Sequence, residues 1–204
     1  MRIAPPREEI VATAELRRQM EALLAAPGPG EQRPCPGCTM TCHRCGSTGC
    51  TCHCSPDCAN ATTALSEEPV RHPIEPRMTP LVYQLNALRV FQPCWSCEGH
   101  VAADGTLLRP PQVSFYAAAE SYVQLLMRHL RALHLRGTLV LPWRIELADF
   151  GQRFAPMYCL GPDLDQVEDV SLARLQQDLT ALTKDLRERI LEGARGVLAE
   201  LERY

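Results

Sequence analysis

Long hydrophobic runs are missing from this sequence of 204 residues, and so is a strong excess of charge of either sign. No stretch approaches the roughly 18 apolar residues of a membrane span, so no membrane segment is expected. The formal net charge is only −3, which removes the strong field that attracts nucleic acid or an anionic membrane. The first 20 residues lack the apolar core of a signal peptide and contain several glutamates, which organelle transit peptides avoid. We therefore expect a cytoplasmic, reducing location.

Common catalytic motifs are also missing. The sequence has no glycine-rich phosphate loop, no His-Glu-x-x-His motif and no Ser-His-Asp spacing. A binding protein is therefore better supported than an enzyme. His129 and His134 are five residues apart on a predicted helix, about 500° of rotation, so they do not form a ready chelate. We interpret both as surface or interface histidines.

Cysteine is the residue that departs from ordinary composition, because eight of the 11 cysteines lie between Cys35 and Cys58. In a reducing compartment this density indicates metal binding rather than disulfides. Large apolar side chains are nearly absent from 35–58, so we predict that metal–sulfur bonds order this segment. The predicted ligands are Cys35, Cys38, Cys42, Cys45, Cys50, Cys52, Cys54 and Cys58.

The spacing of these cysteines is of two kinds. The first four form two pairs with two residues between partners, which lets both sulfurs of a pair reach one zinc ion at about 2.3 Å. The run Cys50-x-Cys52-x-Cys54 would place three sulfurs on one side of an extended chain, which suits bridging thiolates. Two single-ion sites and one polynuclear cluster both remain open. Zinc is the expected metal, and an iron–sulfur cluster or copper(I) are the alternatives.

Two short runs resemble known cysteine-rich proteins. The run 42–49 is similar to the glycine-bearing zinc knuckles of the DnaJ co-chaperones, and the run 50–54 is similar to metallothioneins. Each resemblance covers only a few residues, so neither implies a fold. Metal storage or delivery is nevertheless an alternative to a structural and protein-interaction role.

A second motif, Cys94-x-x-Cys97-x-x-His100, offers three metal ligands. We expect the fourth to be Cys159, with His72 or a cysteine of the first cluster as alternatives. Four protein ligands would give a closed, structural zinc site, whereas water as the fourth ligand would give an open site of the catalytic kind. A redox Cys-x-x-Cys pair is a third alternative, although such pairs ordinarily begin a helix and here a helix is predicted before the motif.

The periodicity predicts an α+β fold, with a mainly helical domain and a small antiparallel β-hairpin. The predicted helices cover 6–25, 81–91, 113–135 and about 165–204, the hairpin turns at Asp104-Gly105, and a strand pair covers 138–147 and 154–160. The expected organisation is an N-terminal helix and linker over 1–34, a cysteine-rich module over 35–58, a proline-rich tether over 59–80 and an α+β domain over 81–204.

The last predicted helix carries leucines in steps of three and four from Leu172 to Leu186. They either pack on the helix's own domain or form a seam for a homodimer. Asp165 with Glu168 is the expected cap of this helix. A protein partner is expected and nucleic acid is not, since a zinc ion with four thiolates carries about −2 and would repel phosphate.

Overall fold

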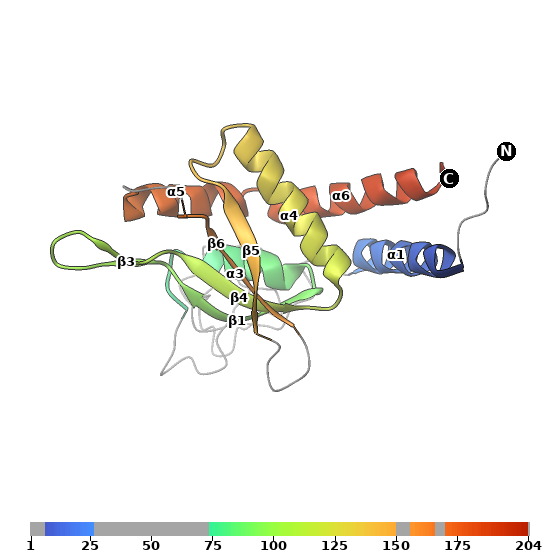
Figure 1. Ribbon diagram of the computed structural model, residues 1–204, viewed down its shortest axis with the longest axis horizontal. Coiled ribbons are helices and arrows are strands. Elements are labelled where there is room, and N and C mark those ends of the chain that lie inside the picture. Colours follow the sequence, from blue (N-terminus) through green and yellow to red (C-terminus); the bar gives the residue numbers. More distant parts are fainter. Residues whose placement is uncertain (1–6, 27–73, 150–155, 166–169, 204) are drawn as a thin grey trace, which may run out of the picture.

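The architecture is that of a computed structural model, which describes residues 7–26, 74–149, 156–165 and 170–203. Within these ranges helices and antiparallel strands are mixed, which confirms the α+β class (Figure 1). The helices are α1 (Arg7–Ala25), α3 (Thr79–Ala87), α4 (Glu120–Leu135), α5 (Leu172–Thr183) and α6 (Leu186–Leu201). The strands are β1 (Phe91–Cys97), β2 (His100–Val101), β3 (Leu107–Arg109), β4 (Gln112–Ala117), β5 (Trp143–Asp149) and β6 (Met157–Pro162).

Four of the strands form an antiparallel sheet in the order β1-β4-β6-β5. Alternate residues of the central strands enter the core, where Phe115 of β4 and Leu160 of β6 are fully buried. The rings of Phe91 and Phe115 meet edge to face, with centroids 5.2 Å apart. Residues between these positions, such as the paired Ser114 and Cys159, belong to the opposite face of the sheet.

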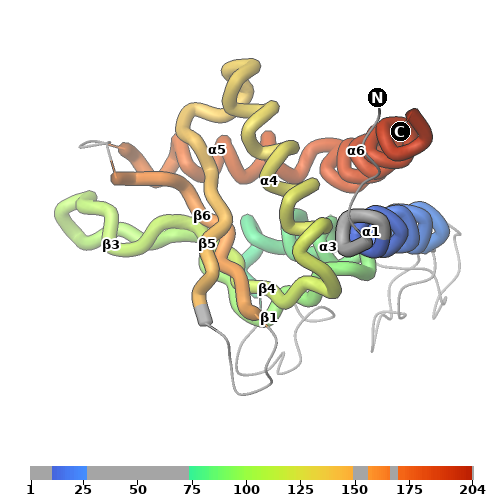
Figure 2. The backbone as a smooth tube through the Cα atoms, turned by 45° about the vertical axis from the view of Figure 1, so that its right-hand side comes forward, coloured from blue at the N-terminus to red at the C-terminus, as the bar shows by residue number. Residues whose placement is uncertain are grey.

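The helices enclose the core on one side of the sheet. Helix α3 packs against β1, and α4 packs against β5 and α6 (Figure 1). Helix α1 lies beside α6 in both views (Figures 1 and 2), and its residues Met20 and Leu23 belong to the same buried cluster as residues of α4 and α6. The N-terminal helix is therefore part of this core. None of the helices in the described ranges is long and apolar enough to cross a membrane.

The predicted turn at Asp104-Gly105 is confirmed. Gly105 has φ +87°, which glycine adopts without steric cost, and its N–H donates to the carbonyl of Ala102 at 2.9 Å. Asp104 Oδ1 accepts a hydrogen bond from the N–H of Thr106 at 2.9 Å. The resulting β2–β3 hairpin extends beyond the sheet (Figures 1 and 2).

The sheet is larger than predicted, because two predicted helices end or begin in strands. The helix expected over 113–135 begins only at Glu120. Val113 and Phe115 are instead alternate residues of β4, and both are buried. The helix expected over 81–91 ends at Ala87, and Phe91 begins β1. Both predictions are wrong in part, since Phe115 and Phe91 satisfy a helical period as well as a strand period.

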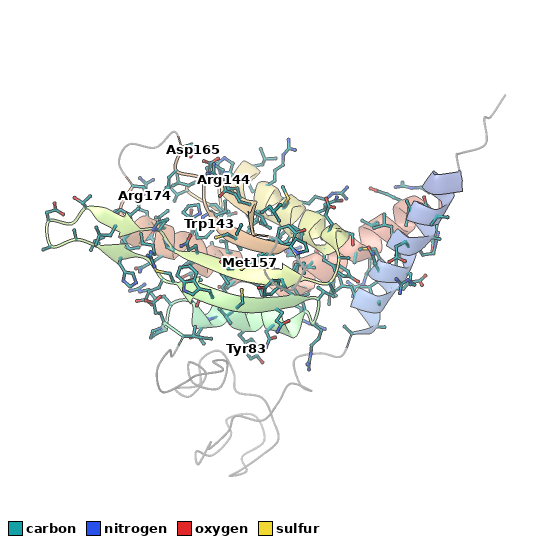
Figure 3. All side chains as sticks on the ribbon, turned by 60° about the horizontal axis from the view of Figure 1, so that its bottom comes forward. Tyr83, Trp143, Arg144, Met157, Asp165 and Arg174 are labelled. Atoms are coloured by element: carbon teal, nitrogen blue, oxygen red, sulfur yellow. The ribbon has the colours of Figure 1, made fainter. Side chains whose placement is uncertain are left out.

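The C-terminal segment is two helices, so the prediction of one long helix is wrong. Asp185, with φ +58°, separates α5 from α6. Ser171 is the N-cap of α5, where its Oγ accepts from the N–H of Arg174 at 3.4 Å. Asp165 instead forms an ion pair with Arg144 of β5 (Figure 3). Leucines of the predicted seam pack within the chain's own core, and the buried ones are Leu175, Leu179, Leu182 and Leu186.

A buried carboxylate fixes the loop that precedes β5. Asp178 of α5 is 1% exposed, and Asp178 Oδ1 accepts a hydrogen bond from the N–H of Val140 at 2.8 Å. Its Oδ2 accepts from the N–H of Leu141 at 3.2 Å and from the indole Nε1 of Trp143 at 3.1 Å. Residues 138–142 were predicted as strand, and they form this loop instead, so β5 begins at Trp143.

His129 lies on the inner side of α4 and is 8% exposed, so the interpretation as a surface residue is wrong for it. Burial, and then the charges of Arg136 and Arg189, lower its pKa below the ordinary 6.5. Its Nε2 atom is buried without a hydrogen-bond partner among the described residues. The folded chain therefore favours a neutral imidazole at this position.

Candidate metal centre

Three side chains with metal-binding atoms converge where strand β1 ends. Glu75 precedes α3, Cys97 ends β1 and His100 begins β2. A carboxylate oxygen, the thiol sulfur and a ring nitrogen of these residues all lie within 4.8 Å of one another. The Nε2 atom of His100 is 3.1 Å from Oε1 of Glu75. The group therefore joins the segment before α3 to the end of β1 and the start of β2.

A tight turn brings Cys97 and His100 together. Gly99 has φ +89°, a left-handed conformation that favours glycine. A Cβ atom at this position would overlap Cδ1 of Leu172 on α5 and would lie 3.0 Å from Cδ of Pro111. The turn is thus packed closely against α5, and glycine is required for both the backbone angle and the close approach.

Hydrogen bonds hold Glu75 beside this turn. The N–H of Glu98 donates to Oε2 of Glu75. The N–H of Arg77 donates to Oε2 of Glu98 at 3.1 Å, and the side-chain amide of Gln176 on α5 donates to the Glu98 carbonyl at 3.2 Å. The Glu98 carboxylate therefore joins the segment before α3 to the turn. Such outer contacts orient ligands in metal sites.

Exposure to solvent increases across the group. Cys97 is 3% exposed, whereas the side chains of Glu75 and His100 are 30% and 53% exposed. A thiol buried to this extent is poorly placed to attack a substrate as a nucleophile activated by His100. A buried thiolate with a more exposed imidazole is, in contrast, compatible with a metal ion that reaches the site from the outer side.

The donor set fits zinc. Thiolate, imidazole and carboxylate groups bind Zn²⁺ at about 2.0–2.3 Å in tetrahedral geometry, which places ligand atoms about 3.3–3.8 Å apart. The three atoms are within 4.8 Å, so contraction by about 1 Å would bring them onto one ion. One carboxylate and one thiolate would neutralise the charge of Zn²⁺. An iron–sulfur cluster, which needs cysteine thiolates, fits this set less well.

Cys94 and Cys159 lie outside the group formed by Glu75, Cys97 and His100. Cys94 is at a β-bulge, where the register of β1 with β4 shifts, and its thiol donates to the carbonyl of Ser114 at 3.4 Å. Cys159 pairs with Ser114 from the other side, on β6. The structure therefore divides the ligands predicted for one site between two places.

The surroundings of Cys94 and Cys159 change the pKa of both thiols. Burial, and then the negative charge that the other thiol would carry, raise the pKa of Cys94. Burial likewise raises the pKa of Cys159, whose Sγ lies 3.6 Å from Oε1 of Gln112. Both thiols are therefore protonated at neutral pH when no ion is bound.

The remaining predicted ligands lie outside the described residues. They comprise the eight cysteines of the segment 35–58, together with His72. The cysteine-rich module and a fourth ligand from it stay predictions.

Glu75 is the member of the group that sequence reasoning missed. It lies in the segment predicted as a proline-rich tether, next to Pro76, and no fixed spacing relates it to Cys97. Only the packing of α3 against β1 brings the two residues together. An acidic residue without a fixed spacing to other ligand types therefore cannot be identified from the sequence as a candidate metal ligand.

Comparison of the chain with models of protein families, with curated proteins and with solved structures found no match.

Proposed function

We propose that this chain is a zinc-binding protein in which an ion held by Glu75, Cys97 and His100 fixes the turn between β1 and β2. Further ions bound by the cysteines of 35–58 order a module that contacts a protein partner. The observation that supports the proposal is the convergence of three zinc-type ligand atoms, two from the turn after β1 and one from the segment before α3.

The ion at this centre has a structural role. It links the segment before α3 to the base of the β2–β3 hairpin, which otherwise extends beyond the sheet. Structural zinc sites contribute on the order of 10–16 kcal/mol in small zinc-binding peptides, a magnitude comparable with the stability of a whole domain. Metal removal should therefore loosen the hairpin more than it loosens the sheet.

A protein partner fits the charge of the chain better than nucleic acid does. The net charge is −3, and the segment 35–64 contains Arg44 and Asp57 as its charged residues. Thiolate ligands add negative charge to that segment, which disfavours binding to phosphate.

The first test measures metal content. The full chain is purified without added metal, and its zinc is measured by mass spectrometry beside the variants Cys97→Ser, His100→Gln and Cys94→Ser. We expect the first two variants to lose about one zinc per chain, since each removes one ligand, whereas Cys94→Ser keeps the zinc content of the parent. Equal zinc in Cys97→Ser and the parent, or an equal loss in Cys94→Ser, would contradict the centre.

The second test concerns the cysteine-rich module. Cys42→Ser should lower the zinc content of the chain while the far-UV helix signal stays largely unchanged, because the core helices pack on one another and on the sheet. A brown protein with broad visible absorbance would instead favour an iron–sulfur cluster. Several readily exchanged ions per chain would favour metal storage or delivery.

A further inference from the structure

We infer a second metal site, on the face of the sheet away from the core, in which the thiolates of Cys94 and Cys159 and the thioether of Met157 bind one copper(I) ion. The site shares no residue with the group of Glu75, Cys97 and His100. It goes beyond the proposed zinc function and does not depend on it.

The three sulfur atoms belong to neighbouring positions on the sheet. The Sγ of Cys94 is 3.7 Å from the Sδ of Met157. Two ligands of one trigonal ion at about 2.3 Å are about 4 Å apart, so this separation already suits a shared ion. Cys159 is two residues after Met157 on β6 and therefore belongs to the same face of the sheet.

The β-bulge in β1 directs the thiol of Cys94 toward Met157. The register shifts between Pro93 and Trp95, and Ser114 of β4 then pairs with Trp95 on one side and with Cys159 on the other. Cys94 is the extra residue at this point, and its thiol reaches the Ser114 carbonyl at 3.4 Å. Strand β4 thus lies between the strands that carry the two cysteines, and Met157, on the strand of Cys159, contacts Cys94.

The donor set distinguishes copper(I) from zinc. Two thiolates and one thioether are soft ligands, and three sulfurs complete the shell of a copper(I) ion, whereas structural zinc takes four ligands and Fe–S clusters take four cysteines. When Cu⁺ binds, two Cu–S bonds replace two S–H bonds and two protons are released; the thioether donates a lone pair, and no electron is transferred.

The test uses the full chain with the eight cysteines of 35–58 replaced by serine, because those thiols would compete for the ion. Copper(I) is titrated without oxygen against the chromophoric chelator bicinchoninate. We expect one tightly bound ion, and an affinity lower by about tenfold or more in Met157→Leu and in Cys159→Ser. Met127→Leu, which changes an exposed methionine of α4, is the matched control and should bind as the parent does. Equal affinity in Met157→Leu and the parent, or an equal loss of affinity in Met127→Leu, would overturn the site.

A second measurement avoids the cysteine replacements. In the wild-type chain with ¹³C-labelled methionine methyl groups, excess copper(I) should shift the Met157 resonance, assigned from Met157→Leu, and leave that of Met127 unchanged. An unshifted Met157 methyl at saturating copper(I) would overturn the site even if the multiply substituted chain did not fold. Zinc content is measured separately, so failure here leaves the zinc centre untouched.

Discussion

Replacement of Asp178 should destabilise the fold strongly, because its buried carboxylate is the acceptor for three donors of the loop before β5. The indole N–H of Trp143 and the N–H of Leu141 donate to one oxygen, and the N–H of Val140 donates to the other. Asp178 and Trp143 are both buried, so water cannot readily take the place of the carboxylate.

The magnitude follows from the donors that lose their partner. In Asp178→Ala the indole of Trp143 and the amide of Leu141 stay buried without an acceptor, at about 1–3 kcal/mol each. Val140 is exposed, and its amide can bind water instead. The expected loss in the free energy of unfolding is therefore roughly 2–6 kcal/mol. Asp178→Asn keeps one carbonyl oxygen, which can face the two buried donors, and should lose about 1–3 kcal/mol.

Urea unfolding followed by far-UV circular dichroism measures these losses, with metal content held equal among the variants. A double-mutant cycle with Trp143→Phe isolates the indole hydrogen bond, for which we expect a coupling energy of about 1–3 kcal/mol. Asp165→Ala is the matched control, since this exposed carboxylate forms a surface ion pair that solvent screens, and its loss should change stability little. A loss in Asp178→Ala no larger than in the control, or a coupling energy near zero, would refute the role of this buried carboxylate.

Two further predictions concern a histidine and a glycine. Burial lowers the pKa of His129, so the unfolded chain binds a proton on this residue at a higher pH than the folded chain does. The contribution of the neutral His129 to the free energy of unfolding is therefore complete above about pH 6.5 and is lost as the pH falls. Thermal unfolding at about pH 7.5 and pH 5.5 should therefore show a smaller acid loss in His129→Leu than in the parent, and an equal loss would contradict this. Gly99→Ala should lower the free energy of unfolding by about 1–3 kcal/mol, because of its positive φ and its overlap with Leu172. Gly105→Ala, at a positive φ in open space, should lower it less in the same unfolding assay. Equal losses would argue against close packing at the turn.

Local signals in the sequence were sufficient for several elements. The amphipathic period predicts α1, and the Asp104-Gly105 pair predicts the β2–β3 turn. The strand pair β5–β6 also forms, with β5 at the edge of the sheet. In each of these cases one short stretch of sequence determines the conformation.

Elements that depend on packing could not be predicted in the same way. Phe115 fits the apolar stripe of the predicted helix, and only its contacts with Phe91 and Tyr158 across the sheet select the strand. The break between α5 and α6 is at Asp185, in a left-handed conformation that costs a non-glycine residue about 1–2 kcal/mol. The neighbouring Leu182 and Leu186 are both buried, so tertiary packing selects this break against the local preference for helix.

The candidate centre shows the same division between local and distant information. Cys97 and His100 were predicted as ligands from their spacing, and the turn at Gly99 places their donor atoms together. Glu75 could not be found from spacing, because the contact of α3 with β1 determines its position. Sequence spacing thus identifies candidate ligands within one turn, and the fold determines which distant residue lies beside them.

Strand geometry explains why Cys94 and Cys97 lie apart. Two cysteines separated by two residues share one ion when the chain turns between them, as in a zinc knuckle. Here both belong to β1, where the extended chain rises about 3.3 Å per residue and therefore places their Cα atoms roughly 10 Å apart, and Cys94 is the extra residue at the bulge. Cys97 consequently meets oxygen and nitrogen donors, whereas Cys94 meets the sulfur of Met157. Since soft and borderline metal ions differ in the ligands they prefer, two cysteines of one strand with such different neighbours would suit different metal ions.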